Sequence, residues 1–428
     1  MVKVCLGRCA LGVAVAIALL AGCVSSESTP VLPMPQMSRS STTPEGNGYK
    51  ILYRFQGGSD GATPDAGLTA YNGTFYGTTA SDGASGFGTA FQITTSGKES
   101  VIHGFIGSPK DGAEPEGVLK VVKGELYGAS VGGGTDGQGT IFKVSTSGRE
   151  RVLYDFKGAA GDGAMPSSGL TVLGGRLYGT TTYGGESSAC ASASCGTVFE
   201  VTLSGIERML YAFKGGADGS WPFAAVVVIN GTLYGTTAYG GANGKGTIFS
   251  LSASGKERVI YSFKGGKDGA RPYGGLAVMS SRLYGTTYAG GISSKCSFYV
   301  GCGTVFEVTT SGAERVLYRF GGYPSDGEGP VSDLVPFNGL LYGTTRYGGS
   351  TACHPASGIV GCGTVFKIST SGSETVLNSF NGGKDGESPS GRLAAFNGKL
   401  YGATDFGGRG ACNDPSGDGC GTVFELSP

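Results

Sequence analysis

The chain has 428 residues, with Lys and Arg equal in number to Asp and Glu at 32 each, so its formal net charge is zero. No run of basic residues occurs, which excludes the concentrated positive surface that nucleic-acid binding requires. Glycine is abundant at 83 residues without a Gly-X-Y period, and the 21 tyrosines and 21 phenylalanines are too many for a disordered chain. This composition favours one large array of short strands joined by tight turns.

The first residues have the pattern of an export signal. Lys3 and Arg8 provide a positive start, and the apolar run over residues 10–20 is too short to span a bilayer as a mature helix. The run ends in Leu20-Ala21-Gly22-Cys23, which resembles a bacterial lipobox. The alternative is an ordinary signal peptide in which the cysteine is incidental.

From this pattern we expect residues 1–22 to be a lipoprotein signal peptide and Cys23 to carry lipid. Residues 23–48 are rich in Ser, Thr and Pro, which predicts a disordered tether. Val24 and Ser25 lack the aspartate associated with inner-membrane retention, so we expect an outer-membrane lipoprotein, periplasmic or surface-exposed. Membrane contact is then expected through the lipid alone.

Three short motifs recur seven times each along the rest of the chain, which is the strongest signal in the sequence. The first is an aromatic-ended strand such as Ile51-Leu-Tyr-Arg-Phe55, whose final Phe lies at positions 55, 105, 156, 213, 263, 320 and 380. The second is Leu-Tyr-Gly or Phe-Tyr-Gly, with its tyrosine at positions 76, 127, 178, 234, 284, 342 and 401. The third is Gly-Thr-Val-Phe or a close variant, starting at glycines 88, 139, 196, 246, 303, 363 and 421.

The segments between these motifs have the chemistry of β-hairpins. Asn-Gly, the preferred dipeptide of two-residue turns, precedes strands such as residues 232–237. A glycine-rich loop then leads to a third strand such as 303–309, and a Thr-Ser-Gly turn leads to a fourth such as 314–320. Four antiparallel strands per repeat form the blade of a β-propeller. No segment beyond the leader has a convincing helical period.

The two ends of the array predict how the ring closes. The array opens with a fourth-type strand, residues 49–55, and closes with a third-type strand, residues 421–426. Pairing them removes two edges that would otherwise invite aggregation. We therefore predict an all-β, seven-bladed propeller over residues 49–428, closed by the N-terminal strand and three C-terminal strands. The alternative, an open solenoid, requires polar caps that the sequence lacks.

The repeated elements GTVFEVTTSG, ERVLYRF, DGxxP and LYGTT resemble the GloVer tandem repeat of bacterial surface proteins. The resemblance covers residues 49–428, nearly all of the mature chain. It implies a secreted or anchored repeat protein. It implies no catalytic residue.

Eight of the eleven cysteines lie in pairs between the second and third strands of their repeats. Repeats with a short version of this loop have none, and the second cysteine always precedes the Gly-Thr-Val-Phe glycine. Structural zinc requires four convergent ligands, whereas each loop offers two thiols, so disulfides are favoured over a metal. Eight cysteines allow 105 connectivities, which repeat symmetry reduces sharply. We predict the local bridges Cys190–Cys195, Cys296–Cys302, Cys353–Cys362 and Cys412–Cys420, and an oxidising compartment.

Asp-Gly pairs precede a proline in every link between repeats, at aspartates 60, 111, 162, 218, 268, 326 and 385. This ring of carboxylates could bind cations, but it lacks the oxygen spacing of a calcium loop. We favour a structural role, in which Asp caps a turn, Gly provides positive φ and Pro starts the next strand.

A specific site should break the sevenfold pattern. The residues after the second strand are small in several repeats but become Tyr288, Arg346 and Asp405 in the last three. The single tryptophan, Trp221, and Arg271 lie in neighbouring DGxxP links. These loops emerge on one face with the cysteine loops, so the five residues form a candidate binding surface. The alternative is ordinary drift of exposed loop residues.

Catalysis has little support in the sequence. There are two histidines, of which His103 replaces a repeat tyrosine in a strand, and no known catalytic or phosphate-binding motif occurs. We expect no cofactor and no metal, and a monomer that acts as a non-catalytic binding or scaffold module for a glycan, peptide or protein. The alternatives are a polysaccharide-active enzyme using carboxylates at the channel mouth and a purely structural surface protein.

Overall fold

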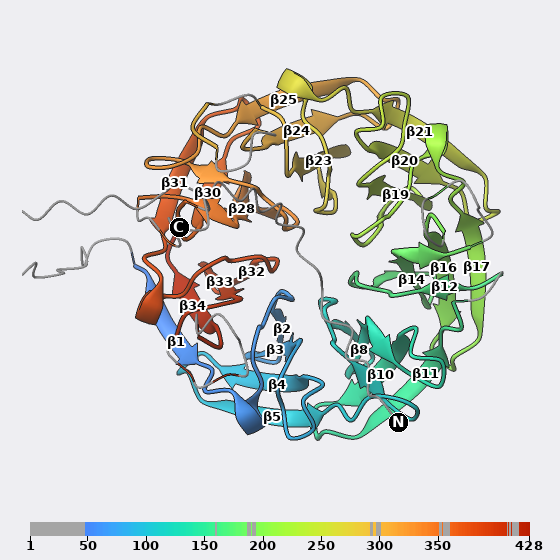
Figure 1. The fold of residues 1–428 in the computed structure, drawn as a ribbon, viewed down its shortest axis with the longest axis vertical. Coiled ribbons are helices and arrows are strands. Elements are labelled where there is room, and N and C mark those ends of the chain that lie inside the picture. The colour runs from blue at the N-terminus through green and yellow to red at the C-terminus, as the bar shows by residue number, and fades with distance from the viewer. Residues whose placement is uncertain are drawn as a thin grey trace, which may run out of the picture. The chain divides into compact units, whose positions relative to one another are not determined.

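Seven four-stranded antiparallel sheets surround one axis in the computed structural model (Figure 1). The structure describes residues 48–158, 161–185, 190, 194–291, 294–296, 301–350, 353, 360–408, 410, 412 and 419–428. The predicted signal peptide, the lipidation site Cys23 and almost all of the tether lie outside these residues. No α-helix occurs in the described part of the chain.

We number the blades in chain order, each from its innermost strand outward. The innermost strands have three residues each: β2 (Thr69–Tyr71), β7 (Lys120–Val122), β13 (Thr171–Leu173), β18 (Val227–Ile229), β22 (Ala277–Met279), β27 (Val335–Phe337) and β32 (Ala394–Phe396). The second strands carry the Leu-Tyr-Gly motif: β3 (Thr74–Thr79), β8 (Glu125–Ser130), β14 (Arg176–Thr181), β19 (Thr232–Thr237), β23 (Arg282–Thr287), β28 (Leu340–Thr345) and β33 (Lys399–Thr404).

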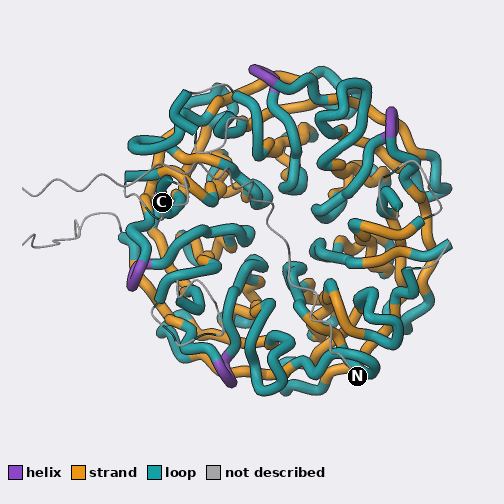
Figure 2. The backbone as a smooth tube through the Cα atoms, viewed as in Figure 1, coloured by secondary structure: helices purple, strands orange, loops and turns teal. Residues whose placement is uncertain are grey.

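The outer half of each blade contains the other two motifs. The third strands are β4 (Thr89–Thr94), β10 (Thr140–Ser145), β16 (Thr197–Thr202), β20 (Thr247–Leu251), β24 (Thr304–Val308), β30 (Thr364–Ile368) and β34 (Thr422–Leu426). The outermost strands are β5 (Glu99–Gly104), β11 (Glu150–Asp155), β17 (Glu207–Ala212), β21 (Glu257–Ser262), β25 (Glu314–Arg319), β31 (Glu374–Ser379) and β1 (Lys50–Arg54). Figure 2 shows the strands as radial groups, with the short 3₁₀ turns at the outer edge.

The ring closes as the ends of the array predicted. β1 pairs antiparallel with β34, in the sheet order β1-β34-β33-β32, so blade 7 is made from both ends of the chain. The register pairs Lys50 with Glu425 and contains a bulge between Ile51 and Tyr53. Outermost strands of the other blades have a bulge at the same place, so β1 is a regular member of the repeat.

Phenylalanine side chains pack one blade against the next. Phe55 at the end of β1 lies edge-to-face on Phe91 of blade 1, with ring centroids 5.1 Å apart, and both residues are fully buried. The same pair recurs at each of the other six junctions, with separations of 5.0–5.3 Å. The ring of Phe91 lies over Gly77 of the Leu-Tyr-Gly motif, where a Cβ atom would be only 2.7 Å away. Glycine is therefore required there by close packing.

The Asp-Gly links have the structural role that the sequence favoured. In every link the aspartate accepts a backbone N–H from the residue after the strand's final Phe, as Asp218 does from Lys214 at 3.0 Å. Four links begin with a 3₁₀ turn: η1 (Gly58–Asp60), η2 (Gly216–Asp218), η3 (Gly266–Asp268) and η5 (Gly383–Asp385). The other three pair with the following loop through two-residue strands: β6 (Gly112–Ala113) with β9 (Gly132–Gly133), β12 (Gly163–Ala164) with β15 (Tyr183–Gly184), and β26 (Gly327–Glu328) with β29 (Tyr347–Gly348).

The expected positive φ of the link glycine holds only in the links with 3₁₀ turns. Gly219 has φ 102°, whereas Gly163 is outside the left-handed region and begins β12. At Gly163 a Cβ atom would lie 2.5 Å from the side chain of Thr181. Lack of space, rather than backbone freedom, requires glycine in that link.

A polar group that we call the rim triad joins consecutive blades at the outer edge. It consists of a tyrosine of one outermost strand, the link aspartate and a glutamate at the start of the next outermost strand, as in Tyr211, Asp218 and Glu257. The tyrosine hydroxyl donates to the aspartate at 2.6–3.1 Å in five of the seven junctions. At the closing junction Asn378 replaces the tyrosine, and Tyr49 replaces the glutamate and donates to the Asp385 carbonyl at 2.8 Å. The remaining junction, between blades 1 and 2, contains His103.

Candidate functional site

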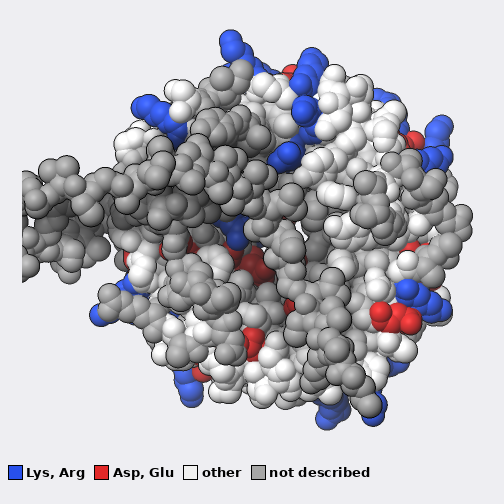
Figure 3. Space-filling view, in the orientation of Figure 1, with Lys and Arg blue, Asp and Glu red and all other residues white. Residues whose placement is uncertain are grey.

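The seven innermost strands line a cavity of about 800 Å³ on the ring axis. Because neighbouring strands alternate in direction, the Asp-Gly links and the cysteine loops lie at the same end of this channel, which we call the mouth. The residue directly after each link proline lines the cavity: Asp65, Glu116, Ser167, Phe223, Tyr273, Val331 and Ser390. Acidic residues therefore come from blades 1 and 2 and aromatic residues from blades 4 and 5. Figure 3 shows acidic and basic side chains meeting in the central hollow.

The backbone that carries these residues is tied to two blades at once. Trp221 and Arg271, two residues of the predicted surface, lie just before their link prolines with φ of 57° and 56°. The Arg271 N–H donates to Lys245 of the previous blade at 2.9 Å, and the Arg271 carbonyl accepts the Tyr288 N–H at 3.0 Å. Equivalent bonds occur in all seven links. The left-handed conformation, unusual for such residues, is therefore held from both sides.

Aromatic side chains form an arc along the mouth over blades 3 to 5. Trp221 packs edge-to-face against Tyr183 and Tyr239, with ring centroids 5.7 and 5.0 Å apart. The hydroxyls of Tyr239 and Tyr273 are 3.1 Å apart, and the Tyr273 ring lies 5.3 Å from that of Tyr288. All five rings are partly exposed, and edge-to-face contacts of this kind hold ring orientations. We call these five residues the aromatic arc.

Two further side chains complete the arc. The Arg271 guanidinium lies 5.5 Å from the ring centroid of Tyr239, a cation–π contact. Phe223, on the cavity wall, packs edge-to-face on Tyr273 with centroids 5.3 Å apart. The Trp221 indole N–H has no hydrogen-bond partner within the described residues and is out of contact with solvent. The arc thus offers ring faces and edges to a ligand, whereas the indole N–H is closed off from the mouth.

Charged side chains gather at the mouth on blades 6, 7 and 1. Arg346 and Asp405 form an ion pair at 3.3 Å, in which the arginine side chain is 35% exposed and the aspartate 2%. The Ser390 hydroxyl donates to Asp405 and is also 3.3 Å from the Asp65 carbonyl. The Nε atom of Arg346 and the Oδ1 atom of Asp65 have no partner among the described residues. We call these four residues the charged group.

The two carboxyls of the charged group influence each other's ionisation. Burial, together with the negative charges of Glu116 and Asp405, raises the pKa of Asp65 well above its ordinary value, and Arg346 only partly opposes this effect. Burial also raises the pKa of Asp405, but Arg346 and Ser390 favour its ionised form. Because neighbouring carboxylates resist joint ionisation, the two carboxyls titrate as a coupled pair, and Arg346 favours the ionised form of Asp405.

The structure thus places all five predicted binding residues at one mouth. They differ in which side of the mouth they lie on and in how deeply they are buried. Trp221, Arg271 and Tyr288 belong to the aromatic side. Arg346 bridges the two sides, since it also lies 6.0 Å from the Tyr347 ring centroid. Asp405 is too deeply buried to meet a ligand directly, so its effect is to position Arg346.

Cavity-lining residues were missed by the sequence reasoning. Phe223, Tyr273, Asp65 and Glu116 line the cavity but were not predicted. They could have been found from the sequence, because each directly follows a link proline and the polarity of the residue at this position changes from blade to blade.

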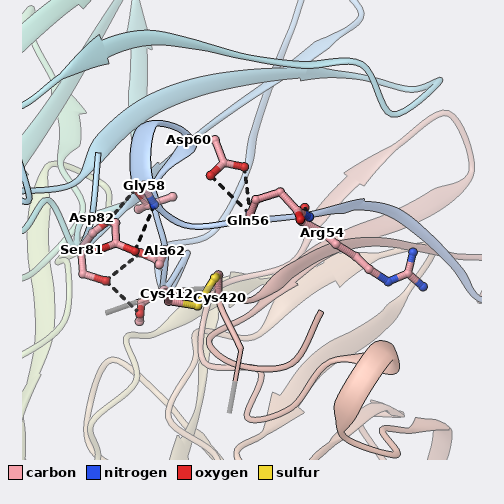
Figure 4. The surroundings of a disulfide bond; sticks show 11 residues. Arg54, Gln56, Gly58, Asp60, Ala62, Ser81, Asp82, Cys412 and Cys420 are labelled. Carbon is pink, nitrogen blue, oxygen red and sulfur yellow. Dashed lines mark hydrogen bonds between the residues drawn. A yellow bond between two sulfur atoms is a disulfide. The ribbon is translucent and has the colours of Figure 1, made fainter. Parts of the chain in front are cut away.

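Four disulfides support this mouth: Cys190–Cys195, Cys296–Cys302, Cys353–Cys362 and Cys412–Cys420. The second cysteine of each pair is buried, and its carbonyl accepts the N–H of the left-handed link residue of the next blade. The acceptor for Trp221 is Cys195, at 2.8 Å, and the acceptor for Thr63, two residues before Asp65, is Cys420, at 3.0 Å. Figure 4 shows the Cys412–Cys420 bridge beside the link from β1, where Gly58 donates to Asp82. The bridges therefore brace the links that carry the site.

Disulfides indicate an extracellular or periplasmic protein. Within the described residues, no helix has the length and apolar character needed to cross a membrane.

Comparison with solved structures finds matches of low sequence identity. The CNH domain of AfRom2 aligns with a TM-score of 0.49 and 9% identity, over 88% of this chain and 98% of that domain. A putative 6-phosphogluconolactonase from Bacteroides uniformis aligns with a TM-score of 0.44 and 12% identity, over 79% of this chain and 89% of the other. The tricorn protease aligns with a TM-score of 0.41 and 11% identity, over 81% of this chain, which spans 28% of the length of that protease.

No curated protein sequence matches this chain significantly. The sequence model of the Gloeobacter/Verrucomicrobia repeat matches it twice, over residues 40–193 and 189–354. These matches cover well over half of the chain and confirm the kinship inferred from the repeated motifs. The chain belongs to the Gloeobacter/Verrucomicrobia repeat family.

Proposed function

We propose that this protein is a non-catalytic binding module of the cell envelope and that its channel mouth binds a glycan. The observation that carries the proposal is the aromatic arc, fixed beside the charged group over one cavity. Sugar rings have apolar faces and hydroxyl edges. They therefore require both surfaces that the mouth provides, partly exposed aromatic rings and polar groups such as the tyrosine hydroxyls and the partly exposed guanidinium of Arg346.

The size of the cavity favours a glycan over a protein partner. About 800 Å³ is within the range of small-ligand sites, whereas a stable protein interface needs roughly 800 Å² of surface on each partner. The end or a short stretch of a polysaccharide fits such a cavity. Arg346 is paired with Asp405, and the cavity wall has both acidic and basic side chains, so no single sign of charge dominates the site. This mixture favours a glycan without a high net charge.

Rigidity gives a second line of support. Ordering a loop on binding costs affinity, and a pre-ordered site avoids that cost. The disulfides and the two-sided backbone bonds hold the links of Trp221 and Asp65 before any ligand arrives.

A glycan array with the purified protein tests the proposal, followed by titration of each hit. Trp221→Ala and Tyr273→Ala should each weaken binding by at least about tenfold, as the loss of a central aromatic contact does. Ile206→Ala is the control, because Ile206 is an exposed residue in the turn between β16 and β17, at the end of the strands opposite the mouth. If the glycans bind both aromatic variants as tightly as they bind the wild type, the channel mouth is not the glycan site. The alternatives that then remain are a peptide-binding module and a purely structural protein.

One observation favours an enzyme as the second candidate. Burial and the nearby charges of Glu116 and Asp405 raise the pKa of Asp65, and a carboxyl with a raised pKa near a second carboxyl is the pattern that glycoside hydrolysis uses. Release of reducing sugar from any array hit, abolished in Asp65→Asn and Glu116→Gln, would replace binding with hydrolysis as the function.

We also propose that lipid on Cys23 anchors the module in the outer membrane. The support is the sequence Leu20-Ala21-Gly22-Cys23 after an apolar run, together with the disulfides. Cys23→Ser should move the protein from the membrane fraction to the soluble fraction or leave the leader uncleaved. A Cys23→Ser protein that stays processed and membrane-bound would contradict lipidation.

A further inference from the structure

One rim triad differs from the equivalent triads at five other junctions in the chemistry of a single residue. At the junction of blades 1 and 2 the triad is His103, Asp111 and Glu150, so imidazole replaces the phenol used in five other junctions. His103 is on β5, Asp111 is in the link and Glu150 begins β11. The three side chains therefore come from two blades and the link between them, on the outer edge and away from the mouth.

The geometry brings three metal-ligating atoms together. His103 Nε2 lies 3.0 Å from Asp111 Oδ2, and one ligand atom from each residue falls within 4.8 Å of the other two. Asp111 is buried and held by two backbone N–H groups, from Ile106 at 3.0 Å and Gly112 at 2.7 Å. The His103 ring packs edge-to-face on Phe105 with centroids 4.8 Å apart. Two of the three ligand groups are thus fixed in position.

The other rim triads show what the histidine changes. There the tyrosine hydroxyl donates to the aspartate, as Tyr211 does to Asp218. His103 bonds Asp111 at the same place through Nε2. The Oε1 atom of Glu150 is out of contact with solvent and has no hydrogen-bond partner among the described residues, and the equivalent atoms of Glu99, Glu257, Glu314 and Glu374 are in the same position. The junction of blades 1 and 2 therefore differs from the others in having an imidazole nitrogen, a metal ligand, where they have a phenol hydroxyl.

We propose that His103, Asp111 and Glu150 bind one divalent transition-metal cation, with Zn²⁺ the preferred ion. One imidazole nitrogen and two carboxylate oxygens belong to the ligand set of zinc, and three protein ligands leave a fourth position for water. Ligand atoms around a tetrahedral ion bound at about 2.0–2.1 Å are roughly 3.3 Å apart, close to the separation of His103 and Asp111. The cation would join the glutamate to the other two side chains, whereas in the other triads the tyrosine hydroxyl bonds the aspartate.

The location gives this cation a structural purpose. In the link to blade 2 the Glu114 N–H donates to the carbonyl of Phe87, because blade 1 has no disulfide loop. In four other links the acceptor is the carbonyl of a disulfide cysteine. A metal that joins β5, the link and β11 would clamp a junction that no disulfide braces.

Calorimetric titration with ZnCl₂ tests the proposal on protein stripped by a chelator and free of any histidine tag. The titration is made at pH 8, because burial and the charge of Asp111 raise the pKa of Glu150 to about 7 and zinc requires deprotonated ligands. The wild type should bind one equivalent and gain Tm with zinc. His103→Tyr restores the sibling triad, so it should fold normally in chelator while its zinc affinity falls at least about tenfold.

The sibling junctions also provide a gain-of-function control. Tyr154→His converts the triad with Asp162 and Glu207 to the same composition and should add a second equivalent of zinc. His354→Ala, which removes the other histidine of the chain, should leave the first equivalent unchanged. The proposal is overturned if the wild type binds no zinc, if His103→Tyr binds as tightly as the wild type, if Tyr154→His gains nothing, or if binding is lost in His354→Ala.

Discussion

At the scale of single residues, the mouth contains two kinds of side chain that behave differently when changed. Aromatic residues such as Tyr273 are partly exposed and contact one another through ring edges. Arg346 and Asp405 form a pair whose carboxylate is 2% exposed. Substitution of an arc residue tests binding, whereas substitution of the pair also disturbs the fold.

Arg346→Ala is therefore expected to destabilise the protein. It leaves the Asp405 charge buried without its partner, and breaking a buried pair from one side costs about 3–5 kcal/mol, reduced here toward about 2–3 kcal/mol because the arginine is partly solvated. Urea unfolding measures the loss. The double variant Arg346→Met with Asp405→Leu should recover most of the stability, because it removes both charges together. A single variant as stable as the wild type would show that the pair is not buried in solution.

The sequence predicts a site residue only where the other repeats show what the ordinary residue at that position is. Tyr288, Arg346 and Asp405 stand out because other repeats have small residues at that position. Phe223 and Tyr273 do not, because the position after the proline differs in nearly every blade and no departure can be recognised. Asp65 was not predicted for another reason, since the rise in its pKa comes from burial and from the charges of Glu116 and Asp405 on other blades. Such contacts between blades do not follow from spacing along the chain.

At the scale of elements, the disulfides act on links rather than only on their own loops. The carbonyl of Cys420 holds the Thr63 N–H of the next blade, so the bridge Cys412–Cys420 stabilises the junction between blades 7 and 1. The sequence predicts the pairs, because the cysteines occur only where the loop is long. It does not show that the second cysteine is also a backbone acceptor for the next blade.

Replacing both Cys412 and Cys420 with serine should lower the free energy of unfolding by about 2–3 kcal/mol, the loop-closure estimate for so short a loop. The local consequence is more specific. Hydrogen exchange at the Thr63 amide should become faster, while exchange at Glu114, which bonds to Phe87 of a blade without cysteines, should not change. Equal acceleration at both amides would mean that the bridge stabilises the ring only globally.

At the scale of the whole molecule, the rim triads make stability depend on pH. Burial, aided by the nearby link aspartate, raises the pKa of six glutamates to about 7: Glu99, Glu150, Glu207, Glu257, Glu314 and Glu374. An unfolded glutamate titrates near its ordinary value of about 4.3. Between these values the folded state binds more protons, so its stability falls as pH rises from about 4.5 to about 7 and is level above that range.

Thermal unfolding should therefore give a lower Tm at pH 8 than at pH 5.5. Glu257→Gln keeps a neutral side chain at every pH, so it should raise Tm at pH 8 and have little effect at pH 5. Lys256→Gln, a neighbouring change outside the triad, serves as the control. A Glu257→Gln effect that is the same at both pH values would contradict the role of the triad in this dependence.

The predicted seven blades and their mode of closure are confirmed, because both follow from counting motifs and matching the incomplete repeats at the ends. Deleting residues 49–55 should leave the outer side of β34 unpaired and cause aggregation, since an open edge strand pairs with other chains. Light scattering and urea unfolding check this result. A soluble deletion variant with wild-type stability would contradict the importance of closure.

The pairing of β1 with β34 also sets the order of events during synthesis. β1 is the first and β34 the last of the described strands in chain order. Their pairing must therefore follow synthesis of every strand between them, and joining segments so far apart in sequence is slow compared with forming local hairpins. Until β34 has been made, the incomplete array has two complementary open edges, and chaperones and proteases have access to it during this interval.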